Sequence, residues 1–137
     1  MIFETKIGSY DIKEESIFKF AEGIPGFENL KRFAVLSRAD TEPIKWFVSL
    51  EDKNVALPII DPWLIFKDYS FTLNEEMLKR IENPKRENVL IFCVIDLHRP
   101  NVTVNLMAPI VINIEKGIGS QIIVEGTKYT SRHSVKV

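Results

Sequence analysis

The sequence predicts a mainly all-β fold, either a sandwich or a barrel, with one short helix. Short runs rich in β-branched and aromatic residues are separated by turn signals about every 8–12 residues, a spacing typical of both architectures. Only one segment places apolar residues at helical spacing. The most β-rich stretch, 103–113, contains Pro109 in its interior, which favours a bent or edge strand because proline donates no backbone N–H.

The N-terminal half is expected to hold five strands, at 2–8, 16–20, 32–37, 44–50 and 55–60. Gly8 would close the first of them. Pro25-Gly26 predicts a type II turn, since proline presets φ at the first central position and glycine accepts a positive φ at the second. Pro58 indicates a sheet edge or a bulge, and the aromatic segment 61–69 is expected to be mostly extended.

One amphipathic helix follows. Thr72, with Glu75 three residues later, predicts a capping box. The apolar stripe at helical spacing consists of Leu73, Met77, Leu78 and Ile81. Asn83-Pro84 would end the helix, which we expect to cover one open end of the sheet structure.

The C-terminal half begins with a nearly all-apolar run, 88–97, which predicts a central strand buried on both faces. A turn at 98–101 would lead into a hairpin partner at 102–106, and the last strand is expected at 121–124. Residues 1–130 should therefore form a single domain, with 131–137 as a loose C-terminal tail.

Pro109 leaves two solutions for the stretch 103–113: two strand pieces that meet at a bend, or one strand at a sheet edge. Asn105 and Asn113 are amides in apolar surroundings. They either face solvent or bond the backbone at the bend, because a buried unpaired amide costs roughly 1–3 kcal/mol.

Composition and charge narrow the class of partner. The chain has 137 residues, of which 45% are hydrophobic and 27% charged, with a formal net charge of −1. This charge argues against direct binding to nucleic acid, which depends on Lys and Arg neutralising phosphates. Residues 1–30 hold six acids against three lysines, whereas the segment from Gly126 holds three cations and no acid. An acidic face attracts a basic protein and repels RNA.

A single cysteine, Cys93, excludes an intramolecular disulfide and fits the reducing cytoplasm. The first residues lack the basic region and apolar run of a signal peptide. The longest apolar run, 89–95, is far shorter than the roughly 20 residues that span a bilayer. We therefore expect a cytoplasmic protein without a membrane partner.

Catalytic chemistry has little support. His98 and His133 have no Cys or carboxylate at ligand or triad spacing, and Cys93 lies in an apolar run where a thiol is unreactive. Asp61 and Asp68 flank an aromatic segment, but Asp61 precedes proline and favours a turn. The sequence also lacks phosphate-binding glycine loops, so it predicts no enzyme, no metal and no cofactor.

Four blocks occur in an order that resembles the flagellar assembly factor FliW family. They are Phe20–Glu28, Trp46 with Ser49–Asp52, Asp61-Pro62 with Tyr69, and Asn105–Asn113 followed by Gly119–Ile123. The resemblance runs from about Phe3 to Arg132. One departure is Val55-Ala-Leu-Pro58, where the family pattern has a phenylalanine-like residue before Asp61-Pro62.

The resemblance implies a small antiparallel β-barrel that has no enzymatic activity. Members of the family bind cytoplasmic flagellin, and they also bind CsrA, the dimeric RNA-binding repressor of translation. When flagellin is exported, the freed family member sequesters CsrA and relieves repression of flagellin mRNA. Two other classes stay open: a small-ligand-binding barrel, which needs an internal cavity, and an RNA-binding barrel of OB type, which needs a basic face.

For the partner contacts, the sequence favours an aromatic group and a bent edge. We expect Trp63, Phe66 and Tyr69 as apolar anchors with Asp68 beside them, because interfaces are enriched in aromatic residues. Asn105 and Asn113 are expected at the bent edge. The alternative for each is a structural role, in the core for the aromatics and in turn bonding for the polar groups.

Overall fold

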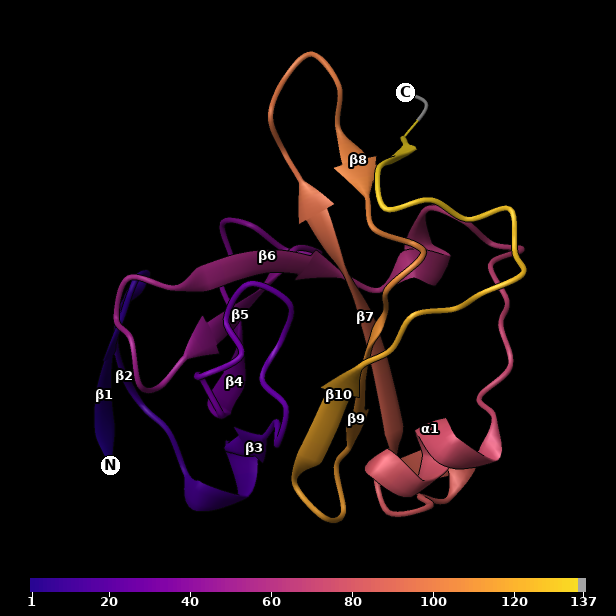
Figure 1. Ribbon diagram of the computed structural model, residues 1–137. Coiled ribbons are helices and arrows are strands. Elements are labelled where there is room, and N and C mark those ends of the chain that lie inside the picture. The colour runs from indigo at the N-terminus through magenta and orange to yellow at the C-terminus, as the bar shows by residue number, and fades with distance from the viewer. Residues whose placement is uncertain (136–137) are drawn as a thin grey trace.

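The computed structural model describes residues 1–135, whose strands curl into a closed ring (Figure 1). Neighbours in the ring are β7-β6-β5-β4-β3-β10-β9, and β9 pairs again with β7. Their bounds are β3 (Phe18–Lys19), β4 (Arg32–Ser37), β5 (Lys45–Ser49), β6 (Ala56–Ile60), β7 (Val89–Asp96), β9 (Ile110–Asn113) and β10 (Ile118–Gln121). All these pairings are antiparallel except β3 with β10, which meet at Lys19 and Ile118. The predicted mainly-β fold, a small antiparallel barrel with one short helix, is confirmed.

Two further pairs of strands lie outside this ring. β1 (Ile2–Thr5) and β2 (Gly8–Asp11) form a separate hairpin, while β8 (Thr103–Val104) and β11 (His133–Ser134) continue the sheet beside β7 (Figure 1). The predicted single strand 2–8 is wrong, because the Thr5 hydroxyl donates to the Gly8 carbonyl at 2.7 Å and closes a turn. Gly8, at φ +124°, therefore opens the second strand.

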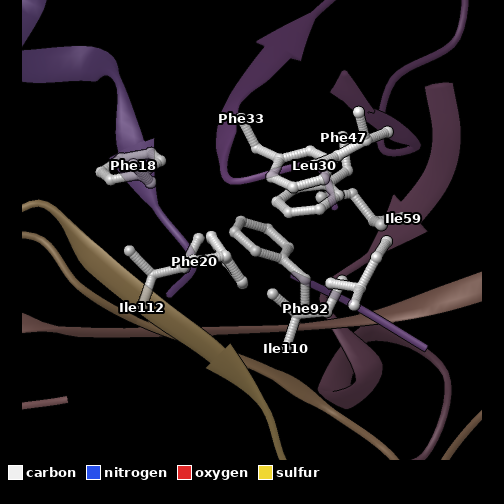
Figure 2. Close-up of a cluster of buried hydrophobic side chains, with 10 residues drawn as sticks. Phe18, Phe20, Leu30, Phe33, Phe47, Ile59, Phe92, Ile110 and Ile112 are labelled. Carbon is white, nitrogen blue, oxygen red and sulfur yellow. The ribbon is translucent and has the colours of Figure 1, made fainter. Parts of the chain in front are cut away.

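Phenylalanine and isoleucine side chains fill the interior of the barrel (Figure 2). The rings of Phe33 and Phe47 stack with centroids 4.4 Å apart, and Phe20 meets them edge-on at 5.5 and 5.2 Å. Gly119 of β10 lies against this group, since a Cβ there would come within 2.5 Å of the Phe20 ring. The space that a small ligand would need is thus occupied by side chains.

The type II turn at Pro25-Gly26 is confirmed. The N–H of Phe27 donates to the carbonyl of Ile24 at 2.8 Å, and Gly26 has φ +89°. Nothing lies within 4 Å of the position a Gly26 Cβ would take, so the backbone conformation alone requires glycine here.

The segment 61–69 curls instead of extending. The Asp61 carboxylate accepts from the Trp63 N–H at 3.0 Å and caps the 3-10 helix η2 (Pro62–Leu64). The N–H of Phe66 then bonds back to the Pro62 carbonyl at 2.8 Å. The expectation of an extended segment missed this Asx turn, although Asp61 does form a turn as predicted. Two further 3-10 turns are η1 (Glu14–Ser16) and η3 (Arg86–Asn88).

Helix α1 (Glu75–Arg80) begins one residue after Asn74, not after Thr72. The Asn74 side chain accepts from the Met77 N–H at 2.9 Å, so an amide cap replaces the predicted capping box. Met77 and the buried Ile81 pack against Val111 and Ile122. Since Ile110 and Ile112 face the barrel interior, α1 covers the outer face of β9. The expectation that the helix covers an open end of the sheet structure is therefore wrong.

Of the two arrangements predicted for the stretch around Pro109, the structure adopts the two strand pieces that meet at a bend. β8 pairs with Ile95–Asp96 and β9 pairs with 89–92, so both pieces lie along the same strand, β7. The bend between them, residues 105–109, contains Pro109. In its middle, β7 is buried on both faces as predicted, because Phe92 joins the interior cluster and Cys93 joins a second cluster on the other face.

The C-terminal region differs from the prediction in two places. β10 begins three residues before the predicted strand 121–124, because Gly119 serves as a strand residue opposite the Phe20 ring. β11 pairs with β8, and the N–H of Val135 donates to the Val102 carbonyl at 3.0 Å. This part of the predicted loose tail is therefore held in the sheet, while 136–137 lie outside the described residues.

Candidate partner-binding surfaces

Six rings form an aromatic cluster beside the C-terminal half of β7: Trp63, Phe66, Tyr69, Phe71, Tyr129 and His133. Tyr69 lies at its centre, with centroid distances of 5.4 Å to Trp63 and 4.7 Å to Tyr129. Phe66 meets the His133 ring edge-on at 5.2 Å. The cluster joins the loop after β6 to the C-terminal segment.

Tyr69 is a core residue in this arrangement. Its side chain is 3% exposed, and its hydroxyl donates to the Leu106 carbonyl at 2.7 Å. Its own carbonyl accepts from the Trp63 indole Nε1–H at 2.7 Å. Burial raises the pKa of the Tyr69 phenol, and burial also raises the pKa of the neighbouring Cys93 thiol to about 12. Both groups are neutral at physiological pH, and Cys93 is a poor nucleophile.

The structure brings four of the predicted contact residues together. Trp63 is 37% exposed, Phe66 is half-buried and Asp68 is exposed, and all three lie around Tyr69. Because Tyr69 is buried, it supports this surface from beneath and does not offer its side chain to a partner. Trp63 and Asp68 form the solvent side.

The two asparagines do not join this group. Asn105 is half-buried at the bend, where its side-chain oxygen accepts from the Ala108 N–H at 3.1 Å, as predicted for a bend. Asn113 is 1% exposed and its amide donates to the Ile81 carbonyl at 2.8 Å, which ties the end of α1 to β9. Asn105 lies beside Val94 and Asn113 beside Val89, so they are roughly 17 Å apart along β7.

A second surface, which sequence reasoning missed, lies where β6 and β7 separate. Their pairing ends at Ile59 and Val94. One step further, Pro58 would face Ile95, and proline has no N–H to continue the ladder. The resulting notch is a hollow of about 410 Å³ lined by Leu57, Pro58, Val94, Ile95, Asp96, Leu97 and His98. Pro58 was the feature of the sequence that could have indicated this notch. β6 is not an edge strand, since it pairs with β5 and with β7, but its pairing with β7 stops next to Pro58.

The notch combines an apolar lining with a charged tip. The Asp96 carboxylate accepts from the His98 backbone N–H at 3.0 Å and contacts the His98 imidazole. These bonds, the backbone one foremost, lower the pKa of Asp96. The ladder between β6 and β7 ends here, and the end of a strand ladder can pair with another chain.

The described residues carry no group of three or more His, Cys, Asp or Glu side chains that could hold a metal ion. Within the same part of the chain, the longest helix is too short and too polar to cross a membrane. What the geometry does provide is surface: exposed aromatic and apolar side chains beside open strand edges. Such features serve recognition of another chain.

Comparison with known proteins agrees with the resemblance in the sequence. The family model described as FliW protein matches residues 1–135. The flagellar assembly factor FliW of Thermosipho africanus is 46% identical over 138 residues, covering 98% of this chain and 95% of that protein. That of Thermotoga maritima is 44% identical over 136 residues, covering 97% of this chain and 91% of the relative.

A solved structure supports the same assignment at the level of the fold. The crystal structure of a flagellar assembly factor FliW superimposes with a TM-score of 0.93 at 30% identity, covering all of this chain and 98% of the other. Sequence and structure thus agree over the whole barrel, the helix and the C-terminal segment, and this chain belongs to the FliW family of flagellar assembly factors.

Proposed function

We propose that this protein binds flagellin in the cytoplasm and, when free of flagellin, binds the translational regulator CsrA. By sequestering CsrA it relieves repression of flagellin mRNA translation. It acts by binding alone, as an assembly chaperone and antagonist, and catalyses no reaction. The observation that carries the proposal is the end-to-end similarity to flagellar assembly factors in both sequence and fold.

The filled interior supports a protein partner over a small ligand. Phe20, Phe33 and Phe47 occupy the centre of the barrel, and the notch beside Pro58 lies at its surface. A barrel that binds small molecules keeps its interior open. This favours recognition on the outer surface.

The distribution of charge supports a basic protein over RNA. All six acids in residues 1–30 are exposed, among them Glu14, Glu15, Glu22 and Glu28. Exposed acids repel the phosphates of RNA and speed the approach of a basic partner. Exposed negative charge of this kind suits an antagonist that binds a basic RNA-binding protein and does not bind RNA.

We place one partner contact on the outer side of the aromatic cluster, at Trp63, Phe66 and Asp68, and a second at the bend around Asn105. Trp63 offers a large, partly exposed ring held at a fixed angle by its bond to the Tyr69 carbonyl. Aromatic anchors held in this way lose little entropy on binding. Tyr69 holds both surfaces in shape, through its bonds to Trp63 and to the Leu106 carbonyl, whereas Asn113 ties the end of α1 to β9 and contributes to neither surface.

A reconstituted repression assay tests the proposal. Purified CsrA is bound to the leader RNA of flagellin mRNA, and the fraction of bound RNA is measured as this protein is added. The proposal expects RNA to be released, and then rebound when flagellin is added in excess. RNA that stays bound throughout, with CsrA and this protein both folded, contradicts the proposal.

A further inference from the structure

The chain that follows β10 has an open edge on one side. The N–H of Ile122 donates to the Pro109 carbonyl at 2.9 Å, and that of Val124 donates to the Met107 carbonyl at 2.8 Å. The N–H and carbonyl of Ile123 point the opposite way and meet no hydrogen-bond partner within residues 1–135. Ile123 is also 51% exposed. β10 reaches β3 only at Ile118, so the edge stays open from 121 to 125.

A groove runs along this edge. One hollow of about 460 Å³ lies between the 22–28 turn, α1 and residues 120–125. A second of about 430 Å³ continues it between 70–74 and 124–127, and the two share Asn74, Met77 and Glu125. We call the pair the edge groove. Met77, Ile122 and Ile123 give it an apolar floor.

The walls of the edge groove are acidic. Four glutamates line it, Glu22, Glu28, Glu76 and Glu125, and Arg80 is the one cation among its lining residues in the described chain. Arg80 is already paired with Glu76 at 3.1 Å. The other three form no salt bridge within residues 1–135.

The groups around Glu28 keep its carboxylate ionised and do not neutralise its charge within the groove. Its carboxylate accepts from the Gly26 N–H at 3.0 Å, and this bond, foremost, lowers its pKa. Lys31 is the nearby cation, but its ammonium is bonded to the main-chain carbonyls of Ala21 and Glu28 and does not line the groove. The edge groove therefore keeps a surplus of negative charge.

We propose that the edge groove binds an extended, basic segment of a protein partner, which adds as a strand along residues 121–125. The backbone of the segment bonds the open groups of Ile123, and alternate Lys or Arg side chains reach Glu22, Glu28 and Glu125. Strand addition takes its affinity from main-chain bonds and its selectivity from alternate side chains. The inference rests on the proposed function only in that the partner is a protein.

Charge and backbone pairing decide against the other occupants. A single-stranded RNA would bring phosphates against three carboxylates, which is unfavourable. A helix would leave the open backbone groups unpaired, because its own are bonded internally. The C-terminal segment of a second copy is basic, with Lys128 and Arg132, but in each chain the neighbouring β11 is paired with β8.

The test uses the full chain and a synthetic peptide of alternating lysine and valine. A peptide with glutamate at the lysine positions is the charge control, and one N-methylated along its bonding edge is the backbone control. The lysine peptide is expected to bind, with amide shifts centred on 121–125. Exchange of the Ile123 amide with solvent should slow, while the amides of Ile122 and Val124, already bonded, change little. Equal binding of the three peptides, or none, overturns the inference.

Two variants locate the site. Ile123→Pro removes a donor that bonds nothing in the free chain, and Glu22→Gln/Glu125→Gln removes two unpaired charges. Each should weaken peptide binding about tenfold. The matched variant Glu4→Gln/Glu87→Gln, which changes the same charge elsewhere, should stay within about twofold. Unchanged affinity in both site variants, with native thermal melts, overturns the inference.

The same variants are titrated with flagellin and CsrA in parallel. If the native chain binds both proteins but no basic peptide, only the edge-groove inference fails. If it binds the peptide but neither protein, the proposed function fails and the groove stands. Gel filtration of the free chain shows whether a second copy occupies the groove, and a dimer lost in Ile123→Pro overturns the choice of a partner protein.

Discussion

The Tyr69 hydroxyl donates a hydrogen bond of 2.7 Å to the Leu106 carbonyl, joining segments that are 37 residues apart. Leu106 lies in the bend that Pro109 imposes, where the carbonyl has no regular ladder partner. The bond therefore satisfies a buried acceptor at the point where the strand beside β7 is interrupted. It couples the aromatic cluster to the bend.

Tyr69→Phe should lower the free energy of unfolding by about 1–3 kcal/mol, because it leaves the buried Leu106 carbonyl without its donor while keeping the ring. Urea denaturation at neutral pH measures the change. The variant should bind partners normally once folded. A stability equal to that of the native protein would mean that water or another donor replaces the phenol.

Trp63→Ala should weaken binding of flagellin or CsrA about thirtyfold, which corresponds to the roughly 2 kcal/mol typical of an aromatic anchor. Trp63→Phe keeps a ring but loses the Nε1–H bond to the Tyr69 carbonyl, so it separates contact from positioning. The control is Leu90→Ala, which removes a similarly exposed apolar side chain near the N-terminal end of β7. If Trp63→Ala binds as tightly as the control with native circular dichroism, the aromatic cluster is structural only.

Gly26→Val should destabilise the fold by about 1–3 kcal/mol, because a β-branched residue is forced to φ +89°. No neighbouring atom contributes to this cost, since nothing lies within 4 Å of the new Cβ. Thermal melts measure the loss. Gly26→Asn, which tolerates this region better, should recover part of it, and a variant pair with equal melting temperatures would refute the turn conformation as the cause.

The buried thiol predicts a fall in stability at alkaline pH. Burial raises the pKa of Cys93 from 9.0 to about 12, so above about pH 9 the unfolded chain loses a proton that the folded chain keeps. The contribution of Cys93 is therefore complete below pH 9 and declines by about 1.4 kcal/mol per pH unit as the pH rises toward 12.

Cys93→Ala provides the comparison, because alanine costs a constant amount at every pH. Urea denaturation of both proteins should show the native chain losing stability more steeply than the variant above pH 9. Parallel slopes would show that the thiol titrates freely and is not buried as described.

Sequence patterns predicted most of the barrel because it depends on alternation and turn chemistry. β4, β5 and the middle of β7 follow directly from their apolar runs. Pro109 left two solutions open, and the structure adopts the one with two strand pieces that meet at a bend. The missed features depend on contacts between distant residues. Gly119 is a strand residue only because the Phe20 ring fills its missing side chain, and β11 exists only because β8 offers it an edge.

The candidate surfaces were harder to predict for the same reason. An aromatic residue that carries a polar tip suits both an interface and a core, and Tyr69 lies in the core because the Leu106 carbonyl accepts a hydrogen bond from its hydroxyl. The Asn113 amide similarly donates its hydrogen bond to the carbonyl of Ile81, the residue that caps the C-terminus of α1. The notch at Pro58 and the open edge at Ile123 depend on where neighbouring strands stop pairing, which local sequence does not specify.

The most direct test of the account is a calorimetric titration of the purified chain with flagellin and, separately, with CsrA, followed by CsrA added to the preformed flagellin complex. The proposed function predicts saturable binding in both separate titrations and little CsrA binding while flagellin is bound. Absence of saturable binding to either protein, with the chain shown to be folded by circular dichroism, would contradict it.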